Sequence, residues 1–247
     1  MQTIEYSHGA KYQLTLDDSS ALVDATLYRK LFGSLIYATT THPDIAFAIG
    51  VLSRFMQQPY QAHWLAAKRI LRYLKGTQHY GLKYSRTKEF SLIGYSDSDY
   101  AGDSTDGKST TGFLMHLGSG AISWKSKKQS VPAVSSSEAE YIAASKATRE
   151  ILWLRRILED LQTPQVSSTP LLIDNQSAIK MAKNPIFHDR TKHINTKYHL
   201  IRYHVKDGSI QLKYCPTTDQ PTDIFTKALG REKLEKFRGI LGLLPSD

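Results

Sequence analysis

The repeat of apolar residues changes its period near Phe90, and this change constrains the fold more than any other feature of the sequence. Before Phe90, apolar residues recur at the three- and four-residue steps that are typical of helices. Three helices are expected there, over residues 24–37, 44–56 and 61–74. After Phe90, alternating residues between Gly- and Ser-containing turns predict an antiparallel meander over residues 90–96, 112–117 and 121–126. We therefore expect a helical module over residues 1–85 and an α/β domain over residues 86–247.

A long helix is expected after the meander. The serine run Ser135–Ser137, with Glu138 and Glu140 in the following turn, is typical of a helix start, and the helical repeat continues to about Leu161. The later patterns predict a strand over 171–174, a helix through 182, a helix over 191–206, a strand over 210–214 and helix after 219. The α/β domain thus contains five strands, the first three consecutive in the chain.

Composition excludes several classes of protein. The 247 residues are 40% hydrophobic, which is enough for a large core. The longest apolar run, Ile45–Leu52, is far shorter than the ~20 residues that a membrane span needs. No signal segment opens the sequence, and the single cysteine, Cys215, fits a reducing compartment. We expect an intracellular protein, cytoplasmic or nuclear, without a membrane partner.

Basic residues gather in two stretches of a chain whose net charge is +9. Residues 45–88 hold eight Lys or Arg and no acid, and a second basic cluster covers residues 180–213. On the expected helix over 61–74, Lys68, Arg72 and Lys75 share one side, opposite an apolar side of Trp64, Ala67, Leu71 and Leu74. A solvated helix face has the same pattern. The concentration of acids elsewhere favours a phosphate-binding surface.

One glutamate of the long helix lies on its apolar side. The apolar stripe runs through Tyr141, Ala144, Ala147, Ile151, Leu154, Leu158 and Leu161. At 100° per residue, Glu140 falls at the centre of this stripe and Glu138 roughly 160° away. Glu140 is therefore expected to point toward the sheet, and Glu138 to be a surface residue near the helix dipole.

Aspartates stand where strands are expected to end. Asp97 closes the first strand, Asp174 closes the fourth, and Asp223 follows the last. Because clefts of α/β sheets lie beyond the carboxyl ends of strands, these acids and Glu140 are expected to converge. Converging carboxylates need cations, and oxygen ligands select Mg²⁺ or Mn²⁺. Asp97 and Asp99 share one strand face, so periodicity alone does not choose between them.

Four motifs carry a family resemblance. Segments 95–102 (YSDSDYAG), 135–141 (SSSEAEY), 172–177 (LIDNQS) and 219–227 (DQPTDIFTK) resemble the ribonuclease H domain of Ty1/copia-type retrotransposon Pol polyproteins. Segments 28–37, 42–45, 52–55 and 68–77 resemble the part that follows the polymerase palm in the same polyproteins. The resemblance covers residues 27–241.

The resemblance implies a fold, an activity and a site. The fold would be ribonuclease H-like, an α/β fold with a mixed five-stranded sheet, three strands of it antiparallel, preceded by a small helical module. The activity would be hydrolysis of the RNA strand of RNA:DNA hybrids with two Mg²⁺ ions, for which Mn²⁺ can substitute. The catalytic and metal-binding carboxylates would be Asp97, Glu140, Asp174 and Asp223. Asp97 would bridge the two ions, with Glu140 and Asp174 on one and Asp223 on the other.

The helical module would resemble a thumb or connection that grips the duplex with Lys68, Arg72 and Lys75. The chain lacks a Tyr-x-Asp-Asp motif, so it does not polymerise DNA alone, and a polymerase domain or subunit is an expected partner. The alternative function is a co-opted nucleic-acid-binding or interaction module without catalysis. An integrase or resolvase is a weaker third hypothesis, because those enzymes use fewer or differently spaced acids.

Other polar residues fit more than one role. Ser136, Ser137 and Gln176 could contact the minor groove of a hybrid or cap their helices. The segment 214–220 lacks the histidine that many cellular ribonucleases H carry after the last strand. A zinc site is not favoured, because the spacing of the candidate histidines does not place them on one helical face. Those histidines are His188, His193, His199 and His204.

Overall fold

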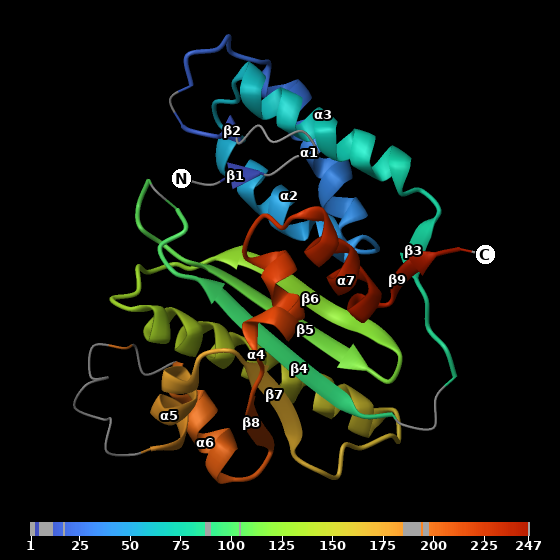
Figure 1. Ribbon diagram of the computed structural model, residues 1–247, viewed down its shortest axis with the longest axis vertical. Coiled ribbons are helices and arrows are strands. Elements are labelled where there is room, and N and C mark those ends of the chain that lie inside the picture. Colours follow the sequence, from blue (N-terminus) through green and yellow to red (C-terminus); the bar gives the residue numbers. More distant parts are fainter. Residues whose placement is uncertain are drawn as a thin grey trace.

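The computed structural model describes residues 3–4, 12–16, 18–86, 90–103, 105–184, 194 and 198–246. Figure 1 shows a group of helices above a twisted sheet, with further helices on both faces of that sheet. Two short strands near the N-terminus, β1 (Thr3–Ile4) and β2 (Tyr12–Gln13), pair antiparallel. Within the described residues, no helix has both the length and the apolar character needed to cross a membrane.

The first 85 residues contain the helices that their apolar repeat predicts. They are α1 (Ala25–Ala38), η1 (Pro43–Ile45), α2 (Ala46–Leu52), η2 (Ser53–Phe55) and α3 (Gln61–Gly76). Asp24 caps α1 by accepting hydrogen bonds from the Thr26 and Leu27 amides. The helix expected over 44–56 is divided, with a single 3₁₀ turn on each side of α2.

The apolar side of α3 differs from the expected one mainly at Leu71, since Ala67 is buried and Trp64 and Leu74 pack against the core. Its core face is formed by His63, Ala66, Ala67 and Ile70, whereas Leu71 is 42% exposed. Small alanines let α3 approach α1 and α2 closely, and the buried imidazole of His63 is fully hydrogen-bonded. Its Nδ1 accepts from the Tyr60 amide at 3.0 Å, and its Nε2 lies 3.0 Å from the Thr15 carbonyl. Hydrophobicity alone does not predict that His63 is buried in the core of the helices while Leu71 is exposed.

The α/β part is built on a mixed five-stranded sheet. Its strands are β4 (Leu92–Asp99), β5 (Thr110–Leu117), β6 (Gly120–Lys128), β7 (Thr169–Ile173) and β8 (Ile210–Tyr214). Their order is β6-β5-β4-β7-β8, with β4, β5 and β6 antiparallel and with β7 and β8 parallel to β4. This topology confirms the predicted ribonuclease H-like fold. Because β4 and β7 run side by side in parallel, their carboxyl ends meet at one edge.

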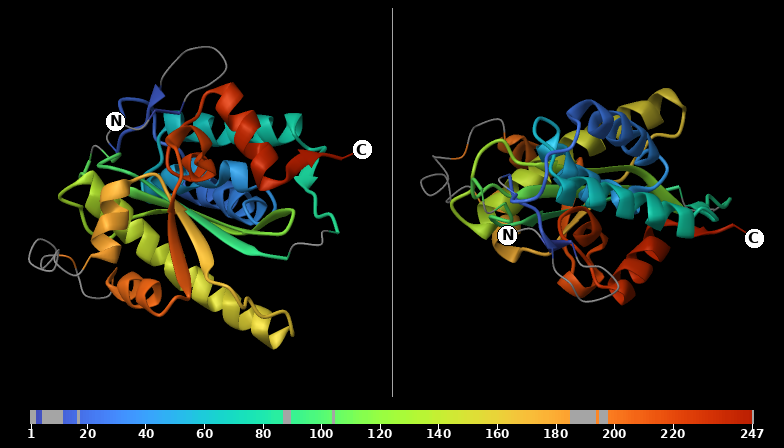
Figure 2. Two further views of the ribbon diagram at one scale, coloured as in Figure 1. Left: turned by 60° about the horizontal axis from the view of Figure 1, so that its bottom comes forward. Right: turned by 90° about the horizontal axis from the view of Figure 1, so that it is seen from above.

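Helices cover both faces of the sheet (Figure 2, left). One face packs against α4 (Ser136–Asp160), α5 (Gln176–Lys183) and α6 (Leu200–Lys206). The other face is covered by η6 (Pro221–Phe225), α7 (Arg231–Leu241), β9 (Leu243–Pro245) and residues of the N-terminal helices. The alternation along β5 shows the two cores, since Phe113 and Met115 pack toward α4 and Leu114 packs toward α7.

Two expected features of the helices differ in the structure. Leu161 does not extend the buried stripe of α4, because it lies beyond the last helical turn and is 65% exposed. Of the helix expected over 191–206, the described part is α6, while residues 191–193 and 195–197 lie outside the described residues. The C-terminal helical region comprises η5 (Thr217–Asp219), η6 and α7.

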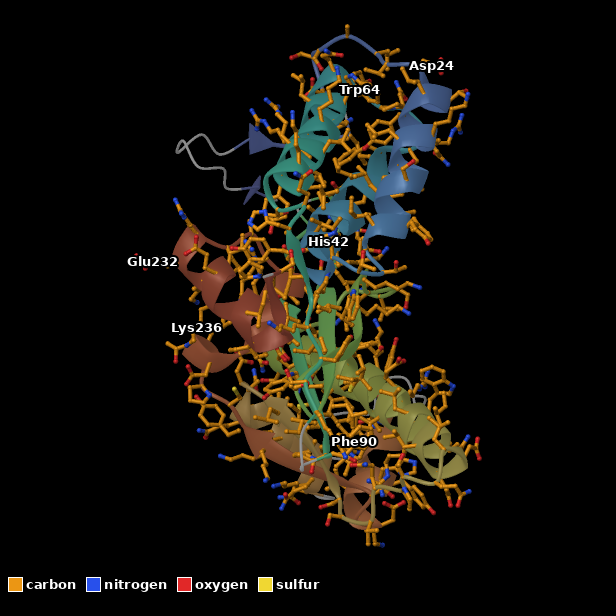
Figure 3. The ribbon with its side chains drawn as sticks, turned by 90° about the vertical axis from the view of Figure 1, so that its right-hand side faces the viewer. Asp24, His42, Trp64, Phe90, Glu232 and Lys236 are labelled. Carbon is orange, nitrogen blue, oxygen red and sulfur yellow. The ribbon has the colours of Figure 1, made fainter. Side chains whose placement is uncertain are left out.

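The N-terminal helices contact the α/β part at several places. Strand β3 (Tyr80–Leu82) pairs antiparallel with β9, which lies close to the C-terminus (Figure 1). The indole of Trp124 donates to the Thr39 carbonyl at 3.0 Å, and Arg54 pairs with Asp103 at 2.7 Å. Figure 3 shows His42 near this junction, with Trp64 above it on α3. The division at residue 85 stays a prediction, and the two parts share a well-packed contact surface.

Candidate active site

Three carboxylates from distant parts of the chain meet at the edge where β4 and β7 end. Asp97 lies in β4, Glu140 in the second turn of α4, and Asp174 immediately after β7. Each offers one oxygen, and these oxygens lie within 4.8 Å of one another. Asp97 is 2% and Glu140 5% exposed, whereas Asp174 is half-buried. We call Asp97, Glu140 and Asp174 the acidic triad.

The structure confirms that Glu140 points toward the sheet. Its Oε1 accepts a hydrogen bond from the Ser98 amide at 2.9 Å. Its Oε2 is buried, and no described residue donates a hydrogen bond to it. A buried carboxylate oxygen without a donor is costly, so this atom is the feature of the site that most requires an external cation.

Glu138 is not the surface residue that its helical position predicts. It is only 6% exposed, because its side chain folds back over the start of α4. Its Oε2 accepts from the Val134 amide at 2.9 Å, while its own amide donates to Ser135 Oγ at 3.2 Å. The two hydrogen bonds form a capping arrangement at the helix start, which is where its charge suits the dipole.

Asp97 and Asp99 lie in different surroundings. Thr226 Oγ1 donates to Asp97 Oδ2, whereas Asp99 accepts from the Thr110 amide. Asp99 also fills the turn after β4, since a Cβ atom at Gly102 would overlap its Oδ2. The structure brings Asp97 into the triad and gives Asp99 contacts of a structural kind.

The carboxylates repel one another and are poorly hydrated. Burial raises the pKa of Glu140 well above its usual value, and the charges of Asp97 and Asp174 raise it further. Burial also raises the pKa of Asp97 and of Asp174, and it raises the pKa of Asp99 to about 7. A divalent cation would remove this repulsion and satisfy Glu140 Oε2. The all-oxygen donor set fits a hard ion such as Mg²⁺ or Mn²⁺.

Asp223 lies next to the triad but faces two lysines. It is fully buried in η6. Lys227 Nζ lies 2.7 Å from its Oδ1 and 3.9 Å from Asp97 Oδ2, and Lys233 Nζ lies 3.6 Å from its Oδ2. Sequence reasoning missed Lys227, although its spacing of four residues from Asp223 could have indicated the pair.

Polar side chains beneath the triad fix the elements that carry it. The Gln129 amide nitrogen, from a residue that is 2% exposed, lies within hydrogen-bond distance of Ser98 Oγ, Thr111 Oγ1 and the Ala139 carbonyl, at 3.0–3.2 Å. It therefore ties β4 and β5 to α4. Thr217 Oγ1 donates to Asp174 Oδ2 at 3.0 Å. Nothing in the sequence singles out Gln129, because its partners come from three separate segments.

The remaining candidates fall outside the triad. Lys68, Arg72 and Lys75 are exposed on α3, and Lys68 Nζ lies 5.1 Å from the ring centre of Trp64. The caps of α4 and α5 are Ser135 and Asn175, so the neighbouring polar residues do not serve as N-caps. Those neighbours are Ser136, Ser137 and Gln176.

The candidate zinc histidines do not gather in the described structure. His199 Nδ1 bonds with Tyr141 OH at 2.9 Å, and His204 Nδ1 with Asp207 at 3.0 Å. His188 and His193 lie outside the described residues.

Comparison with known proteins identifies relatives over nearly the whole chain. A Pol polyprotein of transposon TNT 1-94 from Nicotiana tabacum is 44% identical over 217 residues, which are 87% of this chain and 16% of that protein. A Pol polyprotein of transposon RE2 from Arabidopsis thaliana is 40% identical over 233 residues, or 94% of this chain and 16% of that protein. The chain thus spans about one sixth of the length of these relatives.

Other comparisons add less. No family model matches the chain. Among solved structures, an N-terminal RNase H domain from Mycobacterium tuberculosis is similar with a TM-score of 0.38 and 9% identity, over 60% of this chain and 96% of that one. The relatives, together with the sheet topology described above, confirm the resemblance. The chain belongs to the family of retrovirus-related Pol polyproteins of copia-type retrotransposons.

Proposed function

We propose that the chain is a metal-dependent endonuclease that hydrolyses the RNA strand of RNA:DNA hybrids. The observation that supports this function best is the acidic triad at the carboxyl edge of a ribonuclease H-like sheet. Within it, Glu140 Oε2 is buried and accepts no hydrogen bond from the described residues. The Pol polyprotein relatives favour the same reaction class. A module that only binds nucleic acid would have no need for three mutually repelling carboxylates in its core.

The residues of the site divide into ligands and residues that orient them. Asp97, Glu140 and Asp174 would hold one divalent ion, and Asp97 with Asp223 would hold a second, in a two-metal mechanism with Mg²⁺ or Mn²⁺. Bound ions would supply an activated water and stabilise the leaving oxygen. The Ser98 amide orients Glu140 and Thr217 orients Asp174, so the carboxylates are arranged before any substrate binds.

The test is cleavage of a labelled RNA:DNA hybrid beside matched RNA and DNA duplexes, with Mg²⁺, Mn²⁺ or a chelator. We expect metal-dependent cutting of only the RNA strand of the hybrid, and its loss in Asp174→Asn. Asp160→Asn is the matched control, because Asp160 is exposed at the end of α4. Salt-sensitive binding without cleavage in either metal would contradict the proposal and favour a co-opted binding module.

The exposed basic side of α3 is the proposed duplex contact of the helical module. Lys68, Arg72 and Lys75 lie on consecutive turns, as a phosphate-tracking surface requires. A polymerase region would continue such a contact along the hybrid, and this is the protein partner that we propose.

The three basic residues give a quantitative expectation. Replacing all three by glutamine should weaken hybrid binding at low salt and reduce the slope of log affinity against log salt by up to ~0.9 per lost phosphate contact. Fluorescence anisotropy at several salt concentrations measures this slope. Replacing Lys30, Lys125 and Lys127, which are exposed on α1 and β6, by glutamine removes the same three charges and provides the comparison. An unchanged slope for the α3 variant would remove α3 from the interface.

A further inference from the structure

Lys227 places an ammonium group between two of the buried carboxylates. Its Nζ lies 2.7 Å from Asp223 Oδ1 and 3.9 Å from Asp97 Oδ2. Asp97 therefore belongs to two groups. On one side it is part of the acidic triad, and on the other it shares the Lys227 ammonium with Asp223. The positive charge of Lys227 lies where a second metal ion of the proposed mechanism would bind.

The surroundings of Asp223 explain why a cation must lie there. Asp223 is fully buried, and a carboxylate buried without a compensating charge is strongly destabilising. Lys227 and Lys233 approach its two oxygens separately, so the chain itself provides the compensation. Unlike the two carboxylates, the Lys227 side chain is 42% exposed. Its ammonium can thus move toward solvent by rotation of its own side chain, without any opening of the core.

We propose that Lys227 occupies the second cation position of the site, so that one divalent ion binds first at the acidic triad and a second enters only by displacing the Lys227 ammonium. This inference rests on the proposed function, because it concerns the same carboxylates. It predicts ordered filling of two unequal positions, and it predicts that removal of the lysine strengthens binding at the second position.

The test is a Mn²⁺ titration of the full chain without substrate, by calorimetry and by electron paramagnetic resonance of the free ion. We expect wild type to bind one ion, with the second at least ~10-fold weaker because it competes with a bound charge. In Lys227→Met the second ion should bind at least ~10-fold more tightly than in wild type. Lys227→Arg should behave like wild type, since it keeps the cation.

Lys236→Met is the matched control. Lys236 also pairs with an aspartate, at 2.7 Å, but that partner is the exposed Asp219. Figure 3 shows Lys236 and Glu232 on the outer side of α7, so the control removes a lysine–aspartate pair away from the triad. Its titration should match that of wild type.

Several outcomes would overturn the inference. Two ions bound with equal affinity by wild type, or an unchanged second affinity in Lys227→Met, would contradict the role of Lys227 and leave the proposed nuclease intact. A wild type that binds no Mn²⁺ would contradict both proposals. If Lys227→Met does not fold, Lys227→Gln replaces it in the same titration.

Discussion

Glu140→Gln is expected to abolish RNA cleavage and, at the same time, to raise the unfolding temperature of the metal-free protein. The amide keeps an oxygen for the Ser98 amide and brings an NH₂ group toward Asp97, so repulsion within the triad becomes a hydrogen bond. Each pKa unit by which folding raises a carboxyl corresponds to about 1.4 kcal/mol. Because about 1 kcal/mol moves the Tm of a chain of this size by roughly 2–4 °C, a rise of several degrees is expected.

The stabilisation should depend on pH in a defined direction. The pKa of Glu140 is raised by folding, so the folded state binds the proton more tightly than the unfolded chain, and the wild-type penalty grows as pH rises above the unfolded value. The difference between the variant and wild type in chelator should therefore be largest near pH 8 and disappear near pH 4. Adding Mg²⁺ should stabilise wild type more than the variant, which has lost a ligand.

Cleavage should fall at least ~10³-fold in Glu140→Gln, which corresponds to about 4 kcal/mol of transition-state stabilisation. Thermal scans with chelator and with Mg²⁺, together with the hybrid assay, measure both effects on one sample. Glu159→Gln provides the control, because Glu159 is exposed on the same helix. A variant that is less stable than wild type at pH 8 in chelator would mean that Glu140 is not under charge repulsion.

The success of the sequence argument for Glu140 and its failure for Glu138 have one physical origin. Helical periodicity gives the direction of a Cα–Cβ bond, and this was sufficient for a residue at the centre of the apolar stripe. It does not give the later torsions, through which Glu138 folds back to the Val134 amide and becomes buried. Long polar side chains at helix starts are therefore poorly predicted by face alone.

Residues held by long-range contacts were also beyond prediction. The five strands and the antiparallel meander followed from the pattern and the resemblance, and the ends of β4 and β7 lie together, as the expected convergence of Asp97 and Asp174 requires. Asp97 and Asp99 share one face, and contacts with distant residues distinguish them, such as that of Asp97 with Thr226, 129 residues away. On α3, His63 joins the core because it finds two hydrogen-bond partners, one of them Thr15 in a distant segment. Such pairings exist only once the chain has folded.

A buried charge between the helical module and α7 was likewise not anticipated. Asp44 of η1 has a side chain that is 1% exposed and accepts a hydrogen bond from Tyr73 OH of α3. Arg238 of α7 approaches its Oδ2 at 3.9 Å, and the guanidinium lies 3.8 Å from the ring centre of Tyr80 in β3. The Arg238 guanidinium thus lies beside the Asp44 carboxylate of η1 and the Tyr80 ring of β3. Both elements precede the five-stranded sheet in the sequence.

Arg238→Met should therefore destabilise the whole chain. The methionine can fill much of the space of the arginine stem, but it leaves Asp44 buried without its nearest cation. Removing one partner of a buried ion pair lowers the free energy of unfolding by about 3 kcal/mol or more. We expect the lower end of this range here, because Asp44 can bind a proton and so lose its uncompensated charge. The expected fall in Tm is roughly 6–12 °C. The loss should be smaller at pH 5 than at pH 8, since burial already raises the pKa of Asp44 and removal of Arg238 raises it further.

A double-mutant cycle separates lost charge compensation from lost packing. Asp44→Asn with Arg238→Met should recover part of the stability, because the neutral amide no longer needs a cation. Arg231→Met on the same helix is the control, because Arg231 pairs with Glu235 at the surface, where both side chains are exposed. If Arg238→Met and Arg231→Met unfold at the same temperature, the charge does not hold α7 against the helical module. If only Arg238→Met unfolds early, and if it also cleaves more slowly at temperatures below its Tm, the helical module supports the site through α7, which packs against η6, the element that carries Asp223.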